Sequence, residues 1–185
     1  MPDQETLDRR VPRGELLTPR AAAVAGVAGA ALAGASFAVY GATAHALVGA
    51  ILGPVLAVLS AIDLRHRLLP NIIVGPAAVV IGLVVALGEP HHLRAHLAAS
   101  FVAGGILFVV SLVNPAGMGM GDAKLVFLIG IALGSRTIAA MFDTAVALVA
   151  VALYLVATRG RRGLKTTIPF GPLLALGALV GYFTG

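Results

Sequence analysis

Seven long apolar runs, separated by short breaks rich in glycine, proline and charge, make up most of this 185-residue chain. The runs cover residues 21–41, 46–62, 71–87, 95–113, 122–134, 138–157 and 170–183. About 20 apolar residues cross the hydrocarbon core of a bilayer as an α-helix, which satisfies its own backbone hydrogen bonds. The runs are continuous rather than alternating, so they indicate helices and not the strands of a barrel. We therefore predict an all-α, polytopic membrane helix bundle with about seven transmembrane helices.

The content and placement of charge agree with a membrane protein. Only 11% of the residues are charged and 59% are hydrophobic, whereas about 25% of the residues in soluble domains are charged. If seven spans alternate from a cytoplasmic N-terminus, only Arg94 and Arg136 of the 13 lysines and arginines fall in outer loops. Because cytoplasmic loops are enriched in these residues, we predict a cytoplasmic N-terminus and a C-terminus outside. The net charge of +5 lies in short loops and does not indicate nucleic-acid binding.

The chain before the first run is polar. Residues 1–18 show no apolar periodicity and are predicted to form a flexible tail, and residues 19–185 are predicted to form one transmembrane domain. In the first run small residues recur every four positions, at Ala22, Gly26, Ala30 and Gly34. This spacing predicts a helix face that packs closely against another helix. A cleaved signal peptide ending near residues 33–35 stays open as an alternative, although the acidic tail is long for that role.

The chain contains no cysteine, so disulfides and thiolate zinc sites are excluded. Three histidines, His91, His92 and His96, crowd into one short segment with Glu89 as the only nearby carboxylate. We interpret this segment as a polar loop outside the membrane, and we predict no metal and no cofactor. Asp143, within the sixth run, is assigned no catalytic role.

Two aspartates lie at the ends of apolar runs. Asp63 ends the second run, and Asp122 begins the fifth run after a glycine-rich stretch. Charged groups at membrane depth are costly, so each of them indicates a functional site. Two predicted helices, residues 71–87 and 95–113, lie between the aspartates in the chain and cross the membrane outward and back. The predicted threading therefore brings both carboxylates to the cytoplasmic side. Two neighbouring carboxylates that share one proton can activate a water and protonate a leaving amine, which is the chemistry of an aspartic protease.

Local geometry predicts roles for the residues around this pair. Gly119 and Gly121 lack side chains, so the backbone can adopt positive φ there and an extended peptide can approach closely. Lys124 adds positive charge near Asp122, which begins a helix, whereas Asp63 ends one. Because a helix N-terminus favours an anion and a C-terminus disfavours it, we hypothesise that Asp122 ionises more readily and that Asp63 holds the proton.

The fifth run is unusually short. From Asp122 to Gly134 it would measure about 20 Å as a helix, against about 30 Å of hydrocarbon. Either the helix begins below the membrane surface, which would bury Asp122 in a wettable cleft, or it continues past Gly134. Both possibilities stay open from the sequence.

Three stretches taken together resemble the type IV prepilin peptidases, which are bacterial GxGD-type intramembrane aspartic proteases. The stretches are Asp63 with Leu69-Pro70-Asn71, then Gly119-Met120-Gly121-Asp122-Ala123-Lys124-Leu125, then Ile168-Pro169-Phe170-Gly171-Pro172. The resemblance covers about residues 46–185, and the stretches occur in the family's order.

This resemblance implies that Asp63 and Asp122 are the catalytic pair. We expect the neighbouring residues of the same stretches to position the substrate or the backbone around this pair. These residues are Gly119, Gly121, Lys124, Pro70 and Asn71. The implied substrates are prepilins or pseudopilins, cut at the cytoplasmic face of the bacterial inner membrane between a short basic leader and an apolar helix. The chain has no cysteine and no room for the family's N-terminal methyltransferase domain. We therefore expect a peptidase-only form, as in members that serve tight-adherence pili, and the sequence indicates no oligomeric state.

Two other classes of function use the same aspartates. In a proton-coupled transporter they would carry protons across the bilayer, but a relay needs titratable groups at staggered depths and both acids fall on one side here. A non-catalytic membrane assembly subunit is the third possibility, and the completeness of the three stretches argues against it.

Overall fold

The computed structural model describes residues 16–114, 118–160 and 169–184. Within these ranges it contains seven α-helices and one short 3₁₀ turn. In chain order they are α2 (Pro19–Tyr40), α3 (Ala44–His66), α4 (Asn71–Gly88), α5 (Leu93–Val113), α6 (Met120–Leu133), η1 (Gly134–Arg136), α7 (Thr137–Arg159) and α8 (Gly171–Thr184). Residues 1–15 of the predicted tail lie outside the described ranges. The all-α prediction is confirmed, and each predicted run corresponds to one helix.

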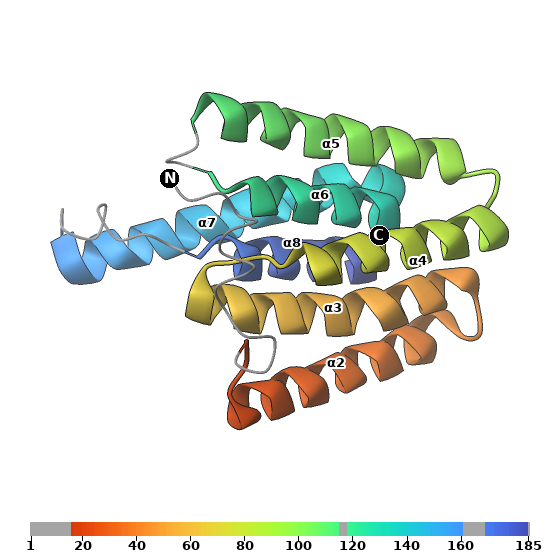
Figure 1. Cartoon of the computed structure of the whole chain (residues 1–185), viewed down its shortest axis with the longest axis horizontal. Helices are drawn as coiled ribbons and strands as arrows, with labels where there is room; N and C mark the ends of the chain where they lie inside the picture. The colour runs from red at the N-terminus through yellow and green to blue at the C-terminus, as the bar shows by residue number, and fades with distance from the viewer. Residues whose placement is uncertain (1–15, 115–117, 161–168, 185) are drawn as a thin grey trace.

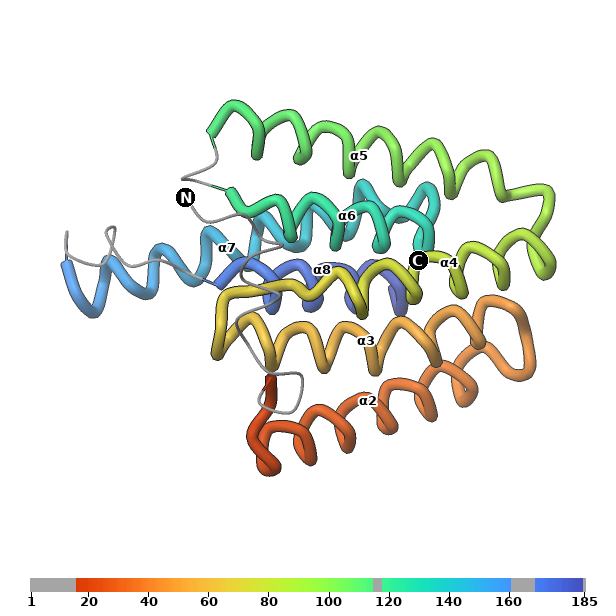
Figure 2. The backbone as a smooth tube through the Cα atoms, in the orientation of Figure 1, coloured from red at the N-terminus to blue at the C-terminus, as the bar shows by residue number. Residues whose placement is uncertain are grey.

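Successive helices run in alternating directions along the bundle (Figures 1 and 2). Five stretches are long and apolar enough to cross a membrane, and the last of them, Met120–Arg159, combines α6, η1 and α7. The chain reverses direction at η1, so α6 and α7 are separate arms of that stretch (Figure 2). Helix α8 is apolar but has only 14 residues. The protein is thus a multi-pass membrane helix bundle.

Local sequence explains where the helices begin and end. Thr18 and Thr43 accept backbone hydrogen bonds as N-caps of α2 and α3, which satisfies donors that a helix start leaves free. Gly41, Gly134 and Gly160 follow the ends of α2, α6 and α7 with φ near +60°, a conformation that glycine adopts without a steric penalty.

Helix α6 lies at the centre of the bundle. Ten of its 14 residues are buried, whereas α7 buries only Thr137, Ala140 and Thr144 of its 23 residues. A side chain at Gly130 would overlap the backbone of Ser100, so α5 and α6 approach closely there. The same helix ends at Gly134, where φ is +58° and the chain turns. Of the two open possibilities, the one in which the helix continues past Gly134 is therefore wrong.

The predicted packing face of the first helix was wrong. Ala22, Gly26, Ala30 and Gly34 are all exposed. The packed face of α2 runs instead through Ala25, Gly29 and Ser36. Gly29 lies against Pro54 of α3, and a Cβ added to it would be 2.8 Å from the Pro54 Cα. Both faces contain small residues at helical spacing, so the spacing alone could not choose between them.

Candidate active site

The last turn of α3 carries Asp63, and the first turn of α6 carries Asp122. The C-terminal end of α3 and the N-terminal ends of α6 and α8 lie at the same end of the bundle (Figure 1). Asp63 is buried and Asp122 is half-buried. Asp63 is close enough for its charge to act on the Asp122 carboxylate. The chain thus brings together two carboxylates that lie far apart in the sequence, and we call this region the aspartate end.

A third helix completes the surroundings of Asp63. The backbone N–H of Gly171, the first residue of α8, donates to Asp63 Oδ2 at 2.9 Å. The carboxylate therefore satisfies a donor that the start of α8 would leave free. The next residue, Pro172, has no N–H to satisfy, and Leu174 N donates to Phe170 O at 3.0 Å.

This contact changes the argument about which aspartate holds the proton. The hypothesis considered only the end of the helix that carries Asp63. The Gly171 N–H and the N-terminus of α8 stabilise a carboxylate at Asp63, which opposes the effect of the α3 C-terminus. The helix ends alone therefore do not decide which of the two aspartates ionises more readily and which holds the proton.

The glycines near Asp122 differ from the expectation. Gly119 precedes α6 in an extended conformation with φ −74°, and its carbonyl accepts from Asp122 N at 3.1 Å. Gly121 lies inside the helix and is buried. Neither has the positive φ that was predicted, because both belong to the start of a helix. A Cβ on Gly119 would lie 3.5 Å from Asp122 Oδ2, so this glycine does border the carboxylate.

A polar contact joins two of the stretches singled out in the sequence. Lys124 Nζ donates to Asn71 Oδ1 at 2.9 Å, across 53 residues of chain. Pro70, which is buried, immediately precedes α4, and its carbonyl accepts from Ile73 N and Val74 N. The pair therefore ties the start of α4 to the first turn of α6, beside Asp122.

Comparison with known proteins agrees with this arrangement. Residues 50–158 match the model of the type IV leader peptidase family, a segment that includes both aspartates. The chain belongs to this family. Similar proteins include the prepilin leader peptidase/N-methyltransferase of Burkholderia pseudomallei strains 1026b and K96243, 35% identical over 167 residues that cover 86% of this chain and 53% of each relative. The protein of the same name from Bacillus subtilis strain 168 is 34% identical over 85 residues, which cover 45% of this chain and 34% of that relative.

The chain thus spans about half or less of the length of these curated relatives. No solved structure gives a significant match. The family match ends before α8, so the Gly171 contact lies beyond it.

The polar contacts at the end of the bundle opposite the aspartates were not anticipated from the sequence. Tyr182 Oη donates to His45 O at 2.7 Å and lies 2.6 Å from Ser36 Oγ. Tyr40 Oη donates to Tyr182 O at 2.6 Å, and Arg136 Nη1 donates to His45 Nε2 at 3.2 Å. We call these five residues the tyrosine end. The sequence did contain a signal for these contacts, because the five polar and aromatic residues lie at or near the ends of apolar runs.

The histidine segment was interpreted only partly correctly. His96 is not in a loop but in α5, where it is buried. Its ring nitrogen Nδ1 donates to Ile131 O at 2.7 Å, which links α5 to α6. Across residues 16–114, 118–160 and 169–184, no three His, Asp or Glu side chains are grouped so as to hold a metal ion.

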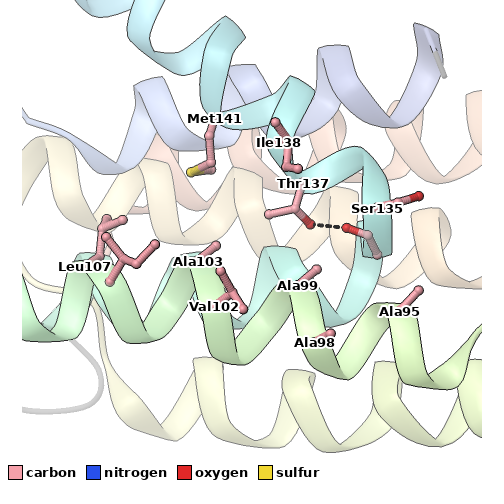
Figure 3. Close-up of a pocket in the computed structure, with 12 residues that line it drawn as sticks. Ala95, Ala98, Ala99, Val102, Ala103, Leu107, Ser135, Thr137, Ile138 and Met141 are labelled. Atoms are coloured by element: carbon pink, nitrogen blue, oxygen red, sulfur yellow. Dashed lines mark hydrogen bonds between the residues drawn. The ribbon is translucent and has the colours of Figure 1, made fainter.

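An apolar pocket of about 450 Å³ lies between α5 and the turn from η1 into α7 (Figure 3). Alanines of α5 line one side and Ile138 and Met141 line the other. Neither aspartate borders this pocket. We do not assign the pocket to the active site.

Proposed function

We propose that the protein is an intramembrane aspartic endopeptidase that removes the short basic leader from prepilin-like precursors. The observation that carries this proposal is the meeting of Asp63 and Asp122 at one end of the bundle, each in the terminal turn of its helix. Family membership and the name of the relatives, prepilin leader peptidase, support the same reaction.

The two carboxylates would divide the work of hydrolysis. One carboxylate, as general base, takes a proton from a water, and the resulting hydroxide attacks the scissile carbonyl carbon. The other, protonated, donates a hydrogen bond to the carbonyl oxygen and then protonates the departing amine. Sharing one proton suits this division, because two like charges at close range do not both ionise readily. Lys124, Asn71 and Pro70 would hold the starts of α4 and α6 in place around the pair.

Access of water follows from the length of α6. Its 14 residues extend about 21 Å, which is shorter than the roughly 30 Å of hydrocarbon. Asp122 would therefore lie below the membrane surface, within reach of water and of a peptide that emerges from an apolar helix.

The substrates would be type IV prepilins, pseudopilins or tight-adherence prepilins, and the membrane would be the bacterial inner membrane. The distribution of basic residues supports an aspartate end on the cytoplasmic side, since only Arg94 and Arg136 would then lie outside. This orientation matches the side on which a basic leader would be retained. A proton transporter is less well supported, because both aspartates lie at the same end of the bundle.

The test is cleavage of a prepilin in membranes that contain the full chain. Asp63→Asn and Asp122→Asn should each reduce cleavage by about 10²–10⁴-fold, because each removes a proton-transferring group. Asp143→Asn, which changes a carboxylate on α7 in the same way, should cleave like wild type. Retention of cleavage by either of the first two variants would contradict the proposal.

A further inference from the structure

Gly171 stands out among the glycines of α8 because its absent side chain faces Asp63, whereas those of Gly177 and Gly181 face α7. The three atoms nearest to a Cβ added there all belong to Asp63: Oδ2 at 2.8 Å, Cγ at 3.0 Å and Cβ at 3.1 Å. Its φ is not positive, so other residues could adopt this backbone conformation. The need for glycine at this position therefore comes from Asp63 rather than from the backbone.

Other glycines of the same helix have a different role. An added side chain at Gly177 would meet Thr144 and the carbonyl of Ala140, and one at Gly181 would lie 3.0 Å from the Ala140 Cβ. Both positions let α8 pack closely against α7, and neither contacts an aspartate. Gly181 thus offers a comparison in which the same methyl group disturbs helix packing alone.

Helix α8 is anchored to α3 at its far end, and its first turn is closed by its own backbone hydrogen bond. At the far end of α8, Tyr182 is buried and bonds to His45 O. At the near end, Leu174 N donates to Phe170 O. A helix held in this way presents its first N–H in one place, so the bond to Asp63 Oδ2 also orients the carboxyl group.

We propose that Gly171 is a positioning residue for Asp63. Its N–H holds Oδ2, and its missing side chain leaves the carboxyl group in a position where Oδ1 can meet water or the scissile peptide. This inference rests on the proposed function, because it concerns the geometry of the same two carboxylates. The active site would then consist of three helix ends, from α3, α6 and α8.

The kinetic test compares Gly171→Ala with Gly181→Ala in prepilin cleavage. A displacement of about 1 Å at a reacting group can cost about 100-fold in rate, so Gly171→Ala should lower kcat by about this factor. Its KM should stay close to that of wild type, because the carboxyl group is displaced while the surface that binds substrate is not. Gly181→Ala should keep kcat close to wild type. Equal loss of kcat in both variants, or no loss in Gly171→Ala, would overturn the inference.

A second measurement does not depend on activity. Thermal unfolding is followed for Gly171→Ala, Asp63→Ala and the double variant, with Gly181→Ala in both backgrounds as the control. The Asp63→Ala change removes two of the three atoms that the new methyl group would meet. Gly171→Ala should therefore lower the melting temperature in wild type and lower it less in the Asp63→Ala background, whereas the effect of Gly181→Ala should be the same in both.

These results separate the two proposals. Additive effects of Gly171→Ala and Asp63→Ala on melting, or a Gly171→Ala protein that fails to fold in both backgrounds, would refute the positioning role even if wild type cleaves prepilin. Absence of cleavage by wild type would refute the proposed function, and the coupling in melting temperature would still report whether Gly171 accommodates Asp63.

Discussion

At the tyrosine end, hydroxyl groups from α2 and α8 bond to each other and to backbone carbonyls, whereas at the aspartate end two carboxylates lie close to each other. Ser36 and Tyr182 have hydroxyl oxygens 2.6 Å apart, and the His45 ring stacks on Tyr182 with centroids 4.6 Å apart. At the aspartate end, Asp63 acts on the Asp122 carboxylate as a like charge. Both ends join α3 to α8 by a hydrogen bond, but only the aspartate end also holds two carboxyl groups close to each other.

This difference indicates how stability and activity are divided in the bundle. Buried polar groups that are hydrogen-bonded hold a structure together, and removing one partner is costly. Like charges held together lower stability, and natural proteins tolerate such arrangements where function needs them. We therefore expect changes at the tyrosine end to affect unfolding and changes at the aspartate end to affect cleavage.

The largest effect on stability is expected from Gly49→Ala. An added methyl group would overlap the hydroxyl groups of Tyr182 and Ser36, so these side chains would have to move. Overpacking of this kind typically costs about 1–3 kcal/mol of unfolding free energy. Unfolding in detergent micelles measures this loss, while the folded fraction should still cleave prepilin.

Gly34→Ala is the matched control for that change. It adds the same methyl group to a helical glycine, with no atom within 4 Å of the new Cβ. Equal melting temperatures for Gly34→Ala and Gly49→Ala would show that the tyrosine end contributes little to stability.

An intermediate effect of opposite sign is expected from Asp122→Asn. Removing one of two like charges should leave the free energy of unfolding unchanged or raise it by up to about 1 kcal/mol, although cleavage is lost. The difference from wild type should vanish well below pH 3.9, the approximate ordinary pKa of aspartate, where both carboxyl groups are protonated. Thermal unfolding at neutral and acidic pH measures both quantities. A lower melting temperature for Asp122→Asn at neutral pH would mean that the aspartate end stabilises the fold.

The smallest effect is expected from the contact between Lys124 and Asn71. The pair is exposed to solvent, so a double-mutant cycle with Lys124→Met and Asn71→Ala should give a coupling of about 0.5 kcal/mol in unfolding. If the pair positions α4 beside α6 for catalysis, the double variant should cleave no more slowly than the slower single variant. Fully additive losses in kcat/KM would instead show that the two side chains act separately.

The helices could be predicted because continuous apolar runs bounded by glycine and proline specify membrane-length helices whatever their partners. The order and direction of the spans also predicted that the helix ends carrying the two aspartates lie at one end of the bundle. The turn at Gly134 was only one of two open possibilities, because the length of an apolar run does not fix where its helix stops. The contacts between helices could not be predicted in the same way. Small residues line more than one face of α2, and 108 residues separate Gly171 from Asp63. The stretch around Gly171 was noticed by its resemblance to the family, but no physical role followed from its residues alone.

Helices α6 and α8 have 14 residues each and both begin at the aspartate end. At about 21 Å each, they are shorter than the bilayer around them, and lipids next to a short helix thin locally or let the polar boundary dip inward. The acyl-chain length of the host lipids would then set how deep the carboxyl groups lie beneath the headgroups. A thicker membrane would distance them from the aqueous phase without altering a single protein contact.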